Sequence, residues 1–92
     1  MSDAENAADR LRLDKWLWRA RFYKTRPLAA AAIAGGKVRV NGAKQTKPGA
    51  GLKIGDALTI AKSGKVTVIR VEAFGARRGP AAEAQTLYTT LD

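Results

Sequence analysis

The stretch that decides the fold is residues 13–36, LDKWLWRARFYKTRPLAAAAIAGG. Its first half places apolar residues at the i, i+3, i+4 and i+7 spacing of one helix face, namely Leu13, Trp16, Leu17 and Ala20. Asp14 falls in the first turn, where an acid stabilises a helix. We therefore predict a first helix over 13–23, with this apolar face in the core.

A second helix is predicted over 25–36, where an alanine-rich run has high helix propensity. Thr25 is a suitable N-cap, but Pro27 biases Arg26 away from helical angles, so that Arg26 is the alternative cap. One of the two glycines after Ala34 provides the left-handed residue that ends the helix. Three residues are expected to face the core: Leu28, Ala32 and Ile33.

Beyond the glycines the apolar pattern changes from helical to alternating, which predicts strands over 38–41, 57–61 and 66–74. In the first strand we expect Val38 and Val40 to point inward and Arg39 outward. The dipeptide Asn41-Gly42 predicts a tight turn, because both of its positions favour positive φ.

The order of these elements predicts an α+β fold, in which two N-terminal helices pack on a small, mainly antiparallel sheet. A short C-terminal helix over 81–87, opened by Pro80, is expected as well. Ninety-two residues are too few for a second domain. We expect a disordered acidic leader over 1–9, one folded domain over 10–75 and a C-terminal extension over 76–92.

The net charge of +9 is concentrated in one segment of the chain. Residues 10–53 contain twelve bases and a single acid, Asp14, whereas 1–9 carry only acids and 54–92 are nearly balanced. A blocked pattern of this kind predicts an anion-binding face, and the expected partner is a polyanion such as nucleic acid. A basic helix can also lie on anionic lipid, but here the bases continue into later elements, which favours a folded binding surface over a membrane.

The first predicted helix carries part of this charge. Arg12, Lys15 and Arg19 keep helical spacing beside the apolar face, which predicts a basic side. Trp16 is expected in the core. Trp18 lies off the apolar face, so it either packs at the rim of the core or stacks on a base.

Composition excludes several kinds of chemistry. The chain contains no Cys and no His, which excludes disulfides, thiolate or imidazole metal sites, and catalysis by these residues. Asp14 and Asp56 are interpreted as a helix-start and a turn residue, and no phosphate-binding loop motif is present. No stretch approaches the ~20 apolar residues of a membrane span. We therefore expect a soluble, cytoplasmic, monomeric protein that is not an enzyme, with no metal, cofactor or small-molecule substrate.

Separated pieces of the sequence keep a common spacing over residues 10–60. They are Arg12-Leu13-Asp14-Lys15-Trp16-Leu17, Lys24-Thr25-Arg26, Ala29, Ile33, Gly36, Val38, Val40, Asn41-Gly42, Gly55-Asp56 and Leu58. Together they resemble the S4-type RNA-binding domain, also called the αL motif. The resemblance implies that 10–75 is such an RNA-binding module.

Two segments point further within that superfamily, namely 13–26 and 77–84. They are similar to the fifteen-kilodalton heat-shock protein family of ribosome-associated bacterial proteins. The resemblance implies a non-catalytic protein that binds structured ribosomal RNA on the large ribosomal subunit, in stress-linked recycling of subunits that still carry a nascent chain on tRNA. Family members continue into a long basic C-terminal helix and tail, whereas the sequence given ends at Asp92, so the resemblance does not carry over any RNA contact of such a tail.

In that family the RNA face is formed by the two helices and the first β-turn. Matched by position, the resemblance implies RNA contacts at Arg12, Lys15, Lys24, Thr25, Arg26, Lys37, Val38, Arg39, Asn41 and Gly42. The charge pattern adds two further candidate bases, Arg19 and Lys44. Thr25 and the first N–H groups of the second helix would hold a phosphate, and Arg26 would bind one bidentately. Val38, Asn41 and Gly42 fit a strand and its turn equally well.

Two other functions stay open at this point. The same module is attached to pseudouridine synthases and tyrosyl-tRNA synthetases, so the chain is alternatively the accessory RNA-binding module of an RNA-modifying enzyme. Two short helices with a tight corner also mimic a helix-turn-helix, which makes a duplex-DNA-binding protein the other alternative.

Overall fold

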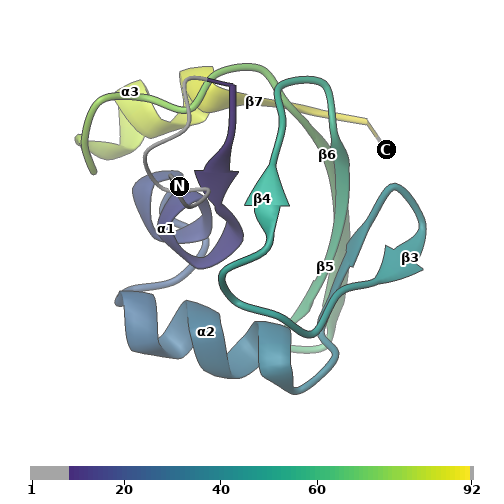
Figure 1. Cartoon of the computed structure of the whole chain (residues 1–92). Helices are drawn as coiled ribbons and strands as arrows, with labels where there is room; N and C mark the ends of the chain where they lie inside the picture. Colours follow the sequence, from purple (N-terminus) through teal and green to yellow (C-terminus); the bar gives the residue numbers. More distant parts are fainter. Residues whose placement is uncertain (1–8, 92) are drawn as a thin grey trace, which may run out of the picture.

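A curved antiparallel sheet carries the helices on one of its faces (Figure 1). In the computed structural model, which describes residues 9–91, the helices are α1 (Leu13–Arg19), α2 (Arg26–Ala34) and α3 (Ala81–Ala84), the last continued by a 3-10 turn, η1 (Gln85–Leu87). The strands are β1 (Leu11–Arg12), β2 (Val38–Val40), β3 (Ala43–Lys44), β4 (Gly51–Leu52), β5 (Ala57–Lys62), β6 (Lys65–Val71) and β7 (Tyr88–Thr90). The predicted α+β class is confirmed, short C-terminal helix included.

The sheet has five strands in the order β3-β2-β5-β6-β7, all antiparallel to their neighbours. A separate pair joins β1 to β4, with Leu11 opposite Leu52. In Figure 1 this pair lies between the helices and the larger sheet. It therefore fixes the entry of the chain into α1.

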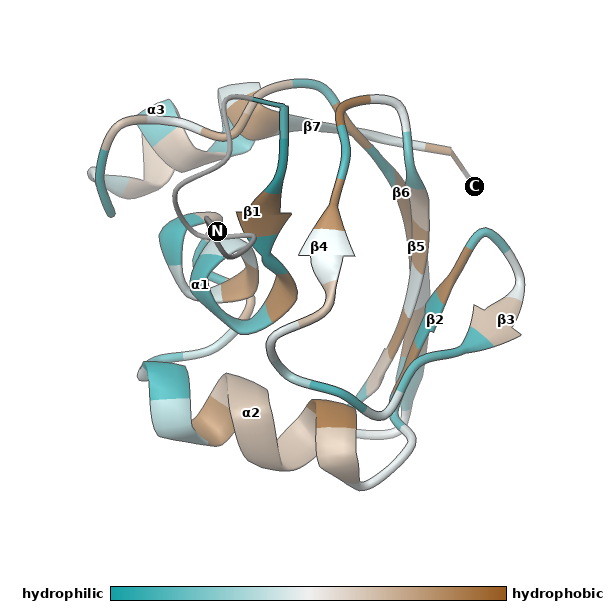
Figure 2. Cartoon of the chain, in the orientation of Figure 1, coloured by the Kyte–Doolittle hydropathy of each residue, from teal (hydrophilic) through white to brown (hydrophobic). Residues whose placement is uncertain are grey.

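The core lies between the two helices and the inner face of the sheet. Trp16, Leu17 and Ile33 come from the helices and are fully buried. They meet alternating residues of β5 and β6, of which Leu58 and Ile69 are also fully buried. Figure 2 shows the brown, apolar segments of these strands beside the helices.

The first helix is shorter than predicted, because it ends at Arg19 and not near Tyr23. Arg21 adopts a left-handed conformation with φ of 65°. The N–H groups of Arg21 and Phe22 then donate to the carbonyls of Trp18 and Leu17, a closing pattern that usually has glycine at the left-handed position. Since an arginine takes that position here, the sequence carries no stop signal.

The second helix begins and ends as the sequence indicates. The Thr25 hydroxyl oxygen accepts the N–H of Leu28 at 3.2 Å, which makes Thr25 the N-cap, and Gly36 closes the helix with φ of 79°. Of the three residues predicted to face the core, Ile33 is fully buried and Ala32 packs against the core, but Leu28 is 52% exposed and Ala29 is buried in its place. The i, i+4 pair at 29 and 33 sets this face.

The hairpin predicted at Asn41-Gly42 is confirmed. Val40 and Ala43 pair directly across it, and both turn residues have positive φ, 52° and 86°. The long strand β6 ends at Val71 instead of Phe74, because the chain leaves the sheet and donates from Glu72 to the carbonyl of Leu87 at 2.8 Å. The pairs β1–β4 and β6–β7 were not predicted.

The segment 73–79 is tied back to α1 by side-chain hydrogen bonds. The indole N–H of Trp16 donates to the Ala73 carbonyl at 2.8 Å, and Arg21 Nε donates to the Gly79 carbonyl at 2.6 Å. Arg78 Nε donates to the Trp18 carbonyl, and its guanidinium lies 5.8 Å from the Trp18 ring centroid. Trp18 therefore packs at the rim, under Arg78.

The predicted leader over 1–9 lies, apart from Asp9, outside the described residues. Among 9–91, no helix combines the length and the apolar character that crossing a membrane requires.

The Trp16 hydrogen bond yields a stability prediction. Trp16→Phe should lower the free energy of unfolding by about 1–3 kcal/mol, because it leaves the partly buried Ala73 carbonyl without its donor and removes ring volume from the core. Trp18→Phe is the matched control, and it should cost at most about 0.5–1 kcal/mol, the value of an exposed cation–π contact. Urea unfolding measures both variants, and the free energy of unfolding should fall with urea concentration at the same slope in each. Equal losses would contradict the role given to the Trp16 indole.

Candidate nucleic-acid interface

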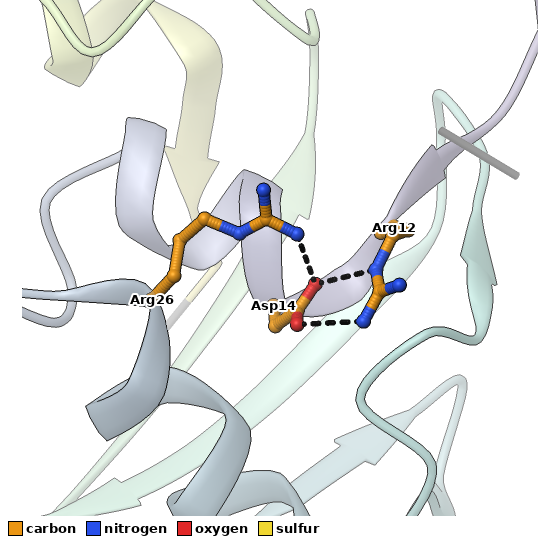
Figure 3. A network of polar contacts seen from close by, with 3 residues as sticks. All are labelled: Arg12, Asp14 and Arg26. Carbon is orange, nitrogen blue, oxygen red and sulfur yellow. Dashed lines mark hydrogen bonds and ion pairs between the residues drawn. The ribbon is translucent and has the colours of Figure 1, made fainter. Parts of the chain in front are cut away.

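The centre of the basic surface is a buried carboxylate shared by two arginines (Figure 3). Asp14 is only 4% exposed. Arg12 donates to both of its oxygens, from Nε to Oδ1 at 3.1 Å and from Nη2 to Oδ2 at 3.0 Å. Arg26 Nη2 approaches Oδ1 from the other side, at 3.6 Å. One carboxylate thus fixes two guanidinium groups at the place where α1 and α2 meet.

The local backbone explains why Asp14 is held there. The N-cap residue of α1, Arg12, makes no side-chain cap hydrogen bond. Instead, the N–H groups of Leu13 and Asp14 donate to the carbonyls of Ala50 and Pro48, at 2.9 and 3.0 Å. The loop over 45–50 therefore caps the helix and packs against the ion-pair network.

Both arginines still reach solvent. Their side chains are 36% and 35% exposed, against 6% for the Asp14 side chain. The fork of Arg12 on Asp14 is the bidentate geometry in which Arg–carboxylate pairs are strongest. The pair therefore presents oriented guanidinium groups, whose freedom has been reduced before any ligand arrives.

Three further bases are close in sequence to this network or to its capping loop, and we call the whole set the junction face: Arg12, Lys15, Lys24, Arg26 and Lys47. Lys15 follows Asp14 on α1 and is half-buried, whereas Lys24 and Lys47 are exposed. Lys47 was absent from the predicted site. It belongs here because its loop caps α1, and the only sequence signal was its place beside Pro48 in a polar loop.

Thr25 is the N-cap of α2 and lies between Lys24 and Arg26 in the sequence. Its oxygen is occupied by the Leu28 N–H, and Pro27 has no N–H to offer. The predicted phosphate contact at this helix start is therefore limited to the hydroxyl hydrogen of Thr25 and the N–H of Arg26.

A second group, the hairpin cluster, consists of Lys37, Arg39 and Lys44, all exposed. Arg39 and Lys44 are directly opposite each other in the register of β2 and β3. A Cβ placed on Gly36 would lie 3.5 Å from the Lys44 side chain, so this lysine extends over the C-terminal end of α2. That helix end carries partial negative charge, which favours a cation there.

The hairpin cluster and the junction face are connected by one stretch of backbone. The chain leaves β3 beside Gly36, and the Gln45 N–H donates to the Val38 carbonyl at 3.1 Å. It then reaches Pro48, whose carbonyl accepts the N–H of Asp14. In Figure 1 this stretch runs above α2 toward α1. The two groups of bases therefore flank one side of the molecule along α2.

Three predicted residues are occupied by the fold itself. Val38 is fully buried, which leaves its side chain no surface for a ligand. The Asn41 amide donates to Asp56 Oδ1 at 3.0 Å, and its oxygen accepts the Ala57 N–H at 2.9 Å. Gly42 accepts a long hydrogen bond from Arg39 Nη1 at 3.4 Å. Their contacts are those of a strand and its turn.

Arg19 points to a different part of the molecule. Its Nη1 donates to the Gly75 carbonyl at 2.7 Å, which ties the end of α1 to the segment 73–79. Arg12 lies in β1, before the helix, and turns to Asp14. Arg12, Lys15 and Arg19 therefore do not form the single basic side expected from helical spacing.

With the fold and this surface described, the chain can be compared with known proteins. The S4 domain family model matches residues 11–58, which contain Asp14, both of its arginines and the β2–β3 hairpin. The chain belongs to the S4 domain family, as the sequence resemblance predicted. Over 84 residues it is 45% identical to heat shock protein 15 of Escherichia coli (strain K12), a match that covers 91% of this chain and 62% of that protein.

For two other relatives, the match covers a larger share of the relative's own length. A solved structure described as the trimeric structure of Vibrio cholerae heat shock protein 15 matches with a TM-score of 0.84 and 43% identity, over 90% of this chain and 83% of that one. The chain is also 34% identical, over 84 residues, to an RQC P-site tRNA stabilizing factor of Listeria innocua serovar 6a, over 91% of this chain and 89% of that protein. The trimer described for the Vibrio protein differs from the monomer expected here.

The shared carboxylate yields a second stability prediction. Asp14→Asn should lower the free energy of unfolding by about 1.5–3 kcal/mol, because charge-assisted hydrogen bonds are lost where two guanidinium groups face each other. Asp9→Asn, at an exposed carboxylate before β1, is the control and should change stability by less than about 0.5 kcal/mol. Thermal unfolding at low salt measures both variants. An Asp14→Asn variant with the same melting temperature as the wild type would contradict this role of Asp14.

Proposed function

We propose that this chain is a non-catalytic RNA-binding protein that recognises structured ribosomal RNA by its shape and phosphate positions. It associates with the large ribosomal subunit and acts in stress-linked ribosome recycling. The observation that carries the proposal is the pair of guanidinium groups oriented by one buried carboxylate, with exposed lysines around it. Oriented arginines of this kind suit phosphate, which they bind bidentately.

The outer surface of α2 supports recognition of phosphates over recognition of base edges. After Arg26 its exposed residues are apolar, namely Pro27, Leu28, Ala31 and Ala34. Figure 2 shows the hydrophilic colour only at the start of this helix. A recognition helix in a DNA major groove needs side chains that donate to or accept from base edges. The duplex-DNA alternative is therefore the weaker one.

The names of the relatives support the choice of partner. Two of them are heat shock protein 15, and a third is named for stabilising tRNA in the P-site. Since the chain spans 62% of the Escherichia coli protein, the activity of the whole relative extends to this chain only as a proposal. Ribosomal RNA and tRNA are the partners that we propose. The alternative function, an accessory RNA-binding module of an RNA-modifying enzyme, would use the same surface to bind RNA.

The binding unit in this proposal is one chain. Sedimentation equilibrium of the protein with and without RNA measures whether it is monomeric, as the sequence led us to expect, or trimeric, as described for the Vibrio protein.

Salt dependence is the first test of function. Each neutralised phosphate adds about 0.7–0.9 to the magnitude of the slope of log affinity against log salt, and we expect about 4–7 phosphates in total. Lys24→Ala combined with Arg26→Ala should lower that magnitude by about 1.4–1.8 for tRNA, measured by fluorescence anisotropy. Arg70→Ala combined with Arg77→Ala removes the same charge from other surfaces and should change it little. A salt-independent affinity would refute the proposal.

The partner is tested separately. Sedimentation with isolated ribosomal subunits at two salt concentrations should place the protein with the large subunit at low salt and release it at high salt. Competition with duplex DNA at matched salt should leave tRNA binding largely intact. Preference for the duplex, or any modified nucleotide formed on incubation with RNA, would favour one of the alternative functions.

A further inference from the structure

A second basic surface lies at the turn between β5 and β6, away from the junction face. An open pocket of about 370 Å³ is lined there by Lys37, Lys62 and Lys65, together with Ser63, Gly64 and Val66. Its volume is within the range of about 300–1,000 Å³ typical of ligand sites. Of its cations, Lys62 and Lys65 lie outside the residues matched by the S4 domain model.

The fold brings these three cations together. Lys62 and Lys65 are directly opposite each other across the β5–β6 turn. The carbonyl of Lys37 accepts the N–H of Ala61 at 2.9 Å, which holds the end of α2 against the same hairpin. Like charges that face each other across paired strands are unfavourable. Within 9–91, no carboxylate forms an ion pair with any of these lysines, so no acid offsets the repulsion between Lys62 and Lys65.

The pocket is also rigidly built. The turn residues Ser63 and Gly64 both have positive φ, 54° and 74°, as in the tight two-residue turns that fix hairpin geometry. The Lys62 Nζ lies 5.4 Å from the ring centroid of Tyr23, which is only 7% exposed. A cation held over a buried ring loses little further freedom when an anion binds.

We propose that this pocket binds a phosphodiester of the RNA backbone, and this inference rests on the function proposed above. Three lysines that line one pocket, with no acid among its lining residues, provide point charges for one phosphate, and Val66 offers an apolar wall for the adjoining ribose. Lys37 belongs to both the pocket and the hairpin cluster. The RNA would thus continue from the junction face past the C-terminal end of α2 to the β5–β6 turn.

The test compares two variants of equal charge. Lys62→Ala combined with Lys65→Ala should lower the magnitude of the salt slope for tRNA by about 0.7–1.8, as expected when one or two ionic contacts are lost. Arg70→Ala combined with Arg77→Ala should have almost no effect, because Arg70 is near the opposite end of β6 and Arg77 pairs with Glu83 at 3.1 Å. The lysine variant should unfold at about the same urea concentration as the wild type, because removal of the like-charge pair offsets the loss of the contact between Lys62 and the Tyr23 ring.

The outcomes separate the two proposals. If the lysine variant matches its control while Lys24→Ala with Arg26→Ala flattens the slope, the pocket inference is wrong and the RNA-binding function stands. If the wild type itself shows no salt-dependent binding, both are wrong.

A free nucleotide is the other source of a phosphate ester, and NMR distinguishes it. The Gly64 amide signal should shift when tRNA is added and should stay in place with adenosine monophosphate alone. A shift with the nucleotide and none with tRNA would overturn the assignment to RNA.

Discussion

A single carboxylate organises the basic half of this molecule. Asp14 begins α1, is almost fully buried and attracts one arginine from β1 and another from the start of α2. Without that acid, two guanidinium groups would face each other at the corner between the helices. With it, the corner is tight and its positive charge is directed outward. The orientation of both arginines depends on this one interaction, and the backbone of the same residue also holds the 45–50 loop.

Elements whose signals are local were predictable, and elements that depend on distant partners were not. The Thr25 cap, the Gly36 stop and the Asn41-Gly42 turn each act within a few residues, so α2 and the β2–β3 hairpin follow from sequence. The end of α1 does not, because Arg21 takes a left-handed conformation that glycine normally signals. The strands β1, β4 and β7 have two or three residues, too few to show alternation.

The same contrast between local signals and distant contacts applies to the candidate surface. Charge blocking along the sequence identified the segment that carries most of the bases, but it could not distinguish bases that share a face from bases that hold the fold together. Arg19 illustrates this, since it serves a carbonyl 56 residues away. Lys47 illustrates the converse, because a capping loop brings it beside Asp14. The side-chain amide of Asn41 bonds to Asp56 and Ala57, 15 and 16 residues further along the chain, which no pattern of residue types could reveal.

The bonds between α1 and the segment 73–79 have a consequence for how the protein is made. Trp16, Arg19 and Arg21 find their carbonyl partners 56 to 58 residues further along the chain. Contacts so distant in sequence slow folding, since a long loop must close before they form. During synthesis the first helix therefore emerges well before its partners. The Trp16 face of that helix stays uncovered until most of the polypeptide has left the exit tunnel, whereas the partners of Asp14 all lie within the first 50 residues and emerge earlier.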